Sequence, residues 1–243
     1  MGKSDVIARL DRVVHDFVLR CRFFHEPLTP ARARSFVKQH WKNTRHRNSV
    51  LKLRVATNCP DWDLRLRIIG ACAEEIIADD AHGGGRPHWL ILEQLGGHIG
   101  VTSDEIRAAP MEPSQELCWA AWDGLMSRTH WLEGLVGNTC AERINLPGYG
   151  EGDFRKRGWF GIERQRWAVL FGLPDEKLEF FELHTEADLA HSNLGWHAVA
   201  DHAARLAMED AVVEACRKNL VVWEHYLHGI AAAGDREAKA RAA

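Results

Sequence analysis

Residues 184–191 read His184-Thr-Glu-Ala-Asp188-Leu-Ala-His191, within a segment of uninterrupted helical character. The two histidines and the aspartate stand at positions i, i+4 and i+7. At about 100° per residue, these steps put the three side chains on one stripe roughly 60° wide. Two imidazoles and a carboxylate on one helix face are a ligand set suited to iron, manganese or zinc. The motif therefore predicts a helix that contributes ligands to a metal site.

Apolar residues spaced by three and four positions dominate the rest of the chain and predict helices throughout it. The predicted helices cover residues 4–24, 30–55, 61–79, 88–98, 114–128, 130–145, 153–171, 175–204 and 205–231. No stretch alternates in the manner of a strand next to a hairpin turn, which argues against a β-rich fold. We expect one all-α domain over residues 1–231, followed by a flexible tail at 232–243.

The composition is that of an ordinary globular protein, with 243 residues, 46% hydrophobic residues and a formal net charge of −3. Without a basic excess, neither nucleic acid nor an anionic membrane surface is expected as a partner. No apolar run approaches the roughly 20 residues that span a bilayer, and no signal peptide begins the chain. The six cysteines are scattered and predict reduced thiols. The expected location is the cytoplasm.

Two glutamates are candidates for the remaining metal ligands. Glu75 ends the apolar stripe of the helix at 61–79, and Glu142 ends the corresponding stripe of the helix at 130–145. Both carboxylates should therefore point into the core, where an unpaired carboxylate would be costly or would become protonated. Metal sites in helical bundles use inward carboxylates and histidines in this way. A further histidine after Glu75 is either His82 or His88.

The order of these residues resembles that of the haem-oxygenase-like di-iron oxidases and oxygenases. In that family a Glu is followed by a His, a mid-chain Glu and finally His-x-x-x-Asp-x-x-His. The resemblance extends over about residues 15–205 and matches Glu75, Glu142 and the motif at 184–191. His88 is the best match for the first histidine, because it precedes the Gly100-Val101-Thr102 turn by twelve residues, as in the family.

Other residues near Glu75 stay open as alternatives to His88. His82 stands seven residues after Glu75, a spacing that also occurs in the family, and Asp79 or Asp80 are further options. His202, eleven residues after His191, is a candidate for the same wall of the site or for a structural role.

The resemblance implies a haem-oxygenase-like helical bundle of about seven to nine helices. It also implies two Fe(II) ions per chain, with O₂ as co-substrate and Glu75, Glu142 and Asp188 as the catalytic carboxylates. The six implied metal ligands are Glu75, His88, Glu142, His184, Asp188 and His191, with His82 as the alternative to His88.

The expected activity is N-oxygenation, desaturation or oxidative C–C cleavage of a small amino-acid-type or fatty-acid-type substrate. An external electron donor is a further expected partner, and the Trp- and Leu-rich helical surfaces permit a homodimer. Two other functions remain open on the same scaffold. One is a metal-independent enzyme of cofactor metabolism, of the thiaminase or pyrroloquinoline-quinone-forming type. The other is a non-catalytic interaction protein.

Overall fold

The computed structural model describes the backbone of residues 2–242 and the side chains of this range, except those of residues 48 and 186–194. All secondary-structure elements of the described residues are helices joined by loops, and their only β-type pairing is an isolated bridge between Asp79 and Arg86. In chain order the elements are α1 (Lys3–Arg20), η1 (Arg22–Phe24), α2 (Pro30–His46), η2 (Arg47–Lys52), α3 (Leu53–Asn58), α4 (Trp62–Ile76), α5 (His88–His98), α6 (Ser103–Ala108), α7 (Pro113–Ser127), α8 (Trp131–Ile144), α9 (Gly152–Phe171), η3 (Asp175–Lys177), α10 (Glu179–Leu206) and α11 (Glu209–Ala242).

The helix starts follow local capping chemistry. The hydroxyl of Thr29 accepts a hydrogen bond from the backbone N–H of Arg32 at 3.2 Å, and Pro30 opens α2. At the start of α4, the Asp61 carboxylate accepts from the N–H of Leu64 at 3.0 Å. Each cap satisfies one of the N–H groups that the first turn of a helix leaves without a partner. The predicted helix start at residue 30 is confirmed, and α4 begins one residue after the predicted start at residue 61.

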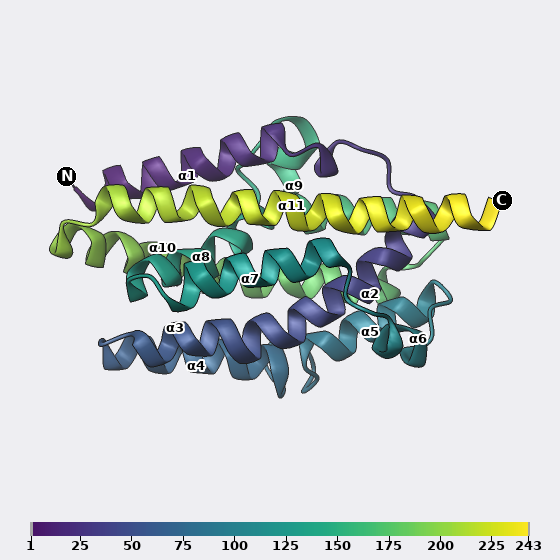
Figure 1. Cartoon of the computed structure of the whole chain (residues 1–243), viewed down its shortest axis with the longest axis horizontal. Helices are drawn as coiled ribbons and strands as arrows, with labels where there is room; N and C mark the ends of the chain where they lie inside the picture. Colours follow the sequence, from purple (N-terminus) through teal and green to yellow (C-terminus); the bar gives the residue numbers. More distant parts are fainter. Residues whose placement is uncertain (1, 243) are drawn as a thin grey trace.

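The helices run along a common long axis, and α11 spans nearly the whole molecule (Figure 1). It packs against α1, α2, α7 and α8, while α10 packs against α8, α9, α1 and α5. Large aromatic side chains fill the interior between these helices, among them the fully buried Trp122, Trp167 and Trp196. All six cysteines are buried and free, which agrees with the predicted reduced thiols.

The described residues form eleven α-helices, more than the seven to nine expected. One reason is the predicted helix at 30–55, which the structure divides into α2, a π-helix and α3. The other is the short helix α6, which the Thr102–Glu105 capping box initiates where the sequence suggested only a turn and a cap. None of the described helices is both long and apolar enough to cross a membrane.

The structure differs from the prediction at the C-terminus. Instead of a flexible tail from residue 232, α11 continues to Ala242. The Asp235 carboxylate accepts two hydrogen bonds from the Arg32 guanidinium, each at 2.7 Å. Gly234 is buried so closely against α2 that an added Cβ would lie 2.6 Å from the Cα of Arg32. These contacts with α2 hold the segment, and its polar composition concealed them.

Candidate metal centre

Three helices bring Glu75, His88 and His184 together in the interior. A ligand atom from each residue lies within 4.8 Å of those of the other two, and all three residues are buried. The His88 and His184 rings meet edge to face with their centroids 4.7 Å apart. Glu75 comes from the last turn of α4, His88 from the first residue of α5 and His184 from α10. The cluster thus joins residues more than 100 positions apart in the chain.

Asp79 holds His88 from behind. Its Oδ2 lies 3.0 Å from His88 Nε2, while Nδ1 of the same ring lies 3.0 Å from Glu75 Oε2. The other oxygen, Oδ1, accepts hydrogen bonds from the N–H groups of Ala81 and His82 at 3.0 and 2.8 Å. One fully buried carboxylate therefore orients the imidazole and organises the loop that leads to it. A carboxylate behind a histidine in this manner is a common support for a metal ligand.

His184 is fixed in one tautomer by its own helix. Its Nδ1 lies 2.7 Å from the carbonyl oxygen of Phe180, one turn earlier in α10. Because a carbonyl can only accept, Nδ1 carries the proton and the lone pair of the neutral ring is on Nε2. Burial lowers the pKa of His184 to about 3, and the positive charge of His88 adds to this effect. The ring is therefore neutral and has one nitrogen suited to binding a cation.

Lys52 links Glu75 to Glu142. Its ammonium donates a hydrogen bond to Glu142 Oε1 at 2.8 Å and lies 3.6 Å from Glu75 Oε1. Lys52 is the last residue of the π-helix between α2 and α3, and only 4% of it is exposed. The ammonium compensates the negative charges of the buried Glu75 carboxylate and the partly buried Glu142 carboxylate.

The charges of the cluster are set by these pairings. Burial alone would raise the pKa of Glu75, but the positive charges of His88 and Lys52 hold it well below its usual value. Burial alone would likewise lower the pKa of Lys52, but Glu142 and Glu75 raise it above its usual value. The centre therefore combines a carboxylate at Glu75 with an ammonium at Lys52.

The structure brings some of the predicted ligand residues together and keeps others apart. Glu75, His88 and His184 meet, and Glu142 joins them through Lys52. His82 is turned toward Asp79, with Nδ1 at 3.6 Å from Oδ1, and it is not part of the cluster. Asp188 and His191 lie on α10 but outside the residues whose side chains are described, so their place in the site stays a prediction.

A crystal structure from Shewanella denitrificans OS217 is similar to this chain over most of its length. It is a domain of unknown function with a heme oxygenase-like fold, and the TM-score is 0.69. The match covers 95% of this chain and 92% of the other, at 14% sequence identity. The chain has a haem-oxygenase-like fold.

No protein-family model matches the sequence, and no curated protein does. The predicted haem-oxygenase-like fold is thus confirmed, whereas membership of the di-iron family stays a prediction. A fold shared at this identity does not carry a function with it, so function has to be argued from the site.

Within this haem-oxygenase-like fold, two cavities border the centre. A small one, of about 60 Å³, is lined by Glu75, Glu142, His184 and Lys52, together with residues of α2 and α9. A larger one, of about 310 Å³, lies against α4 and α8 and has Lys52 and Glu142 in its wall. Leu64, Ile68 and Leu135 give this larger cavity an apolar side, and Arg67 and Glu74 give it charge. Lys52 and Glu142 border both cavities.

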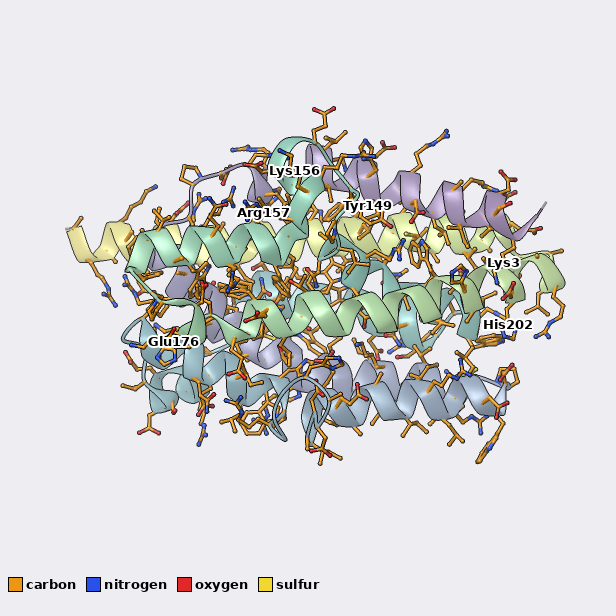
Figure 2. All side chains as sticks on the ribbon, turned by 180° about the vertical axis from the view of Figure 1, so that it is seen from behind. Lys3, Tyr149, Lys156, Arg157, Glu176 and His202 are labelled. Carbon is orange, nitrogen blue, oxygen red and sulfur yellow. The ribbon has the colours of Figure 1, made fainter. Side chains whose placement is uncertain are left out.

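His202 lies away from this centre. Figure 2 labels it near the end of α10 that is distant from Glu176. Its Nε2 is 3.5 Å from Asp61 Oδ2, and its ring packs edge to face against Trp131. Of the two roles considered for His202, these contacts support the structural one.

Sequence reasoning missed the roles of Lys52 and Asp79. Lys52 lies where a continuous helix was expected, and the π-helix that directs it inward leaves no clear signal in the sequence. Asp79 did carry a signal. It stands four residues after Glu75 in the predicted helix at 61–79, where this spacing would put both residues on one face. The structure ends α4 at Ile76, and Asp79 lies beyond it in the bridge with Arg86.

Proposed function

We propose that this chain is a non-haem, O₂-dependent iron oxidase or oxygenase acting on a small molecule. The observation that carries the proposal is the buried cluster of Glu75, His88 and His184. Two imidazoles and one carboxylate are ligands of the kind that hold Fe(II) and leave positions open for other molecules. The tautomer of His184 and the Asp79 support behind His88 also fit this use.

In this proposal, Glu75, His88 and His184 would hold one Fe(II). His88 would release the proton of Nδ1, the nitrogen that faces Glu75, and keep the Nε2 proton that faces Asp79. Glu142, Asp188 and His191 would hold a second, which gives two per chain. Lys52 has to leave Glu142 before that carboxylate can bind a cation, since the ammonium is hydrogen-bonded to it. Lys52 would thus balance the charge of the carboxylates until metal arrives.

The residues of the chain would bind the iron, orient its ligands and hold protons beside the substrate. Asp79 fixes the His88 ring, and Phe180 fixes the His184 ring through its carbonyl oxygen. Glu75, Glu142 and Asp188 would be the catalytic carboxylates, which balance the metal charge and accept protons beside the substrate. Iron bound in such a site supplies O₂ activation for N-oxygenation, desaturation or oxidative C–C cleavage, with electrons from an external donor where the reaction needs them.

The substrate would enter the larger cavity. Its volume of about 310 Å³ is that of a site for a small molecule. The apolar side formed by Leu64, Ile68 and Leu135 suits a hydrocarbon chain, and Arg67 suits a carboxylate. An amino-acid-type or fatty-acid-type molecule has both features.

Anaerobic titration of the metal-free protein with Fe(II) tests the proposal. We expect tight binding that His184→Ala and Glu75→Gln weaken at least tenfold, because each removes a ligand. His202→Ala, a histidine of the same helix outside the cluster, is the matched control and should leave binding unchanged. The Fe(II)-loaded protein should then consume O₂ when amino acids or fatty acids are supplied. Absence of Fe(II) binding, or binding that neither ligand variant alters, would exclude the proposal.

One observation favours a second candidate, a metal-independent enzyme of cofactor metabolism. Lys52 is ion-paired with both Glu75 and Glu142, and a lysine between two carboxylates is a group that could transfer protons to and from a substrate. Such an enzyme would turn over its substrate in the presence of a chelator. It would lose activity in Lys52→Met, whereas an iron enzyme would lose activity to the chelator.

A further inference from the structure

A second group of metal-binding side chains lies where the first long helix meets the last. The sulfur of Cys21, a carboxylate oxygen of Glu224 and a ring nitrogen of His228 all lie within 4.8 Å of one another. Cys21 is the C-cap residue directly after α1, and α1 runs along α11 in Figure 1. Glu224 and His228 are four residues apart on α11, so they share one face of that helix. The group shares no residue with the candidate metal centre.

These three side chains make few contacts with other polar groups among the described residues. Cys21 is fully buried, and the Nε2 atom of His228 is buried without a hydrogen-bond partner among the described residues. The Glu224 side chain is 25% exposed, and its carboxylate lies 3.7 Å from Nε of Arg20. A buried ring nitrogen without a partner calls for an explanation such as an ion. The exposed edge of Glu224 gives an ion a route from solvent.

The turn after α1 directs backbone hydrogen bonds from Phe23 and Phe24 at the Cys21 sulfur. Burial raises the pKa of the Cys21 thiol to about 12, but hydrogen bonds from the backbone of Phe23 and Phe24 act in the opposite direction. Backbone N–H groups directed at a sulfur stabilise a thiolate once a cation has replaced its proton. The 3₁₀ turn η1, which follows Cys21 directly, contains both of these residues.

We propose that Cys21, Glu224 and His228 form a separate site for a borderline-soft divalent cation, for which Zn²⁺ is the best match. A thiolate, an imidazole and a carboxylate are the three ligand types of protein zinc sites. Zinc–ligand bonds of about 2.0–2.3 Å imply donor separations of about 3.5 Å, so the side chains would close by about 1 Å on binding. The Cys21 thiol releases its proton to solvent as the sulfur–metal bond forms, and water completes the coordination. The bound cation would fasten the end of α1 to α11.

Titration of the metal-free protein with Co²⁺ tests this site, since a cobalt–thiolate bond gives an intense near-ultraviolet charge-transfer band. We expect the band to reach its full intensity when the Cys21 sulfur of each chain has bound one Co²⁺ ion. Cys21→Ser should abolish it, and His228→Gln and Glu224→Gln should weaken the binding at least tenfold. Zn²⁺ should displace the cobalt and raise the thermal midpoint of the wild type by more than that of Cys21→Ser, because the candidate metal centre is intact in both proteins.

Cys72→Ser is the matched control, because Cys72 is a buried cysteine three residues before Glu75. Its band should equal that of the wild type. The inference fails if wild-type protein gives no thiolate band, if the band survives Cys21→Ser, or if it disappears in Cys72→Ser. Should Cys21→Ser not fold, the His228→Gln titration still decides, because unchanged cobalt affinity in that variant also contradicts the site.

Discussion

Lys52 determines the charge balance of the candidate centre at the level of a single residue. Removing one partner from a buried ion pair costs about 3–5 kcal/mol, because the other charge is left without compensation. We therefore expect Lys52→Met to lower the free energy of unfolding of the metal-free protein by about that amount, as measured by urea denaturation. Fe(II) should recover most of the loss, since the cation would replace the missing ammonium charge.

Lys42 provides the control for this change. It is also buried, though less deeply, at 8% exposed against 4% for Lys52. No carboxylate is paired with it among the described residues, and its ammonium lies 5.7 Å from the Trp41 ring centroid. Lys42→Met should change the stability by less than about 1 kcal/mol. Equal losses in the two variants would show that burial alone, and not the pairing with Glu75 and Glu142, explains the effect.

At the level of elements, the kink in α9 brings two segments into close contact. Gly158 has φ 69° and ψ 176°, which interrupts the helix, and an added Cβ would lie only 2.0 Å from the carbonyl oxygen of Asn145. This approach sets α9 against the end of α8, the helix that carries Glu142.

Gly158→Ala should therefore destabilise the protein by about 3 kcal/mol or more, through backbone strain and the steric clash together. Gly172→Ala is the comparison: Gly172 has a similar φ of 63° but a left-handed ψ of 34° that other residues tolerate, and no heavy atom lies within 4 Å of an added Cβ. It should cost only about 1–2 kcal/mol. Calorimetry of both variants measures the two losses of stability. If the losses were similar, the close approach of Gly158 to Asn145 would contribute nothing to the stability.

The predictability of the elements depended on the kind of signal. Apolar spacing and caps indicated most helices, because both act within a few residues. The π-helix at Arg47–Lys52 and the docking of Asp235 on Arg32 were not predicted. Both depend on contacts with helices distant in sequence, and such contacts leave no periodic pattern. For the site, inward carboxylates at Glu75 and Glu142 could be read from apolar stripes, but the ammonium between them could not.

At the scale of the whole molecule, buried neutral histidines make the stability depend on pH. Burial lowers the pKa of His40 to about 3, and that of His184 also to about 3. The unfolded chain takes up protons at these rings below about pH 6.5, whereas the folded chain does not. Stability is therefore lost as the pH falls from about 6.5, by up to about 1.4 kcal/mol per pH unit for each ring.

His40→Gln isolates one of these contributions. The slope of unfolding free energy against pH should decrease by about 1.4 kcal/mol per pH unit between about pH 6 and pH 4. His225→Gln, at an exposed position of α11, is the control and should keep the wild-type slope. Urea titrations at several pH values give both slopes. An unchanged slope in His40→Gln would mean that the buried ring takes up protons in the folded state.

The two oxygens of Asp79 connect the buried His88 ring to two backbone amides whose hydrogen exchange can be measured. Oδ2 holds the His88 ring, and Oδ1 holds the backbone N–H groups of Ala81 and His82. Any event that changes how His88 is held also acts on these two amide protons, which belong to a loop at the surface. Their exchange with deuterium is thus a non-perturbing signal of occupancy at a centre that is itself buried, and it needs neither a chromophore nor a known substrate.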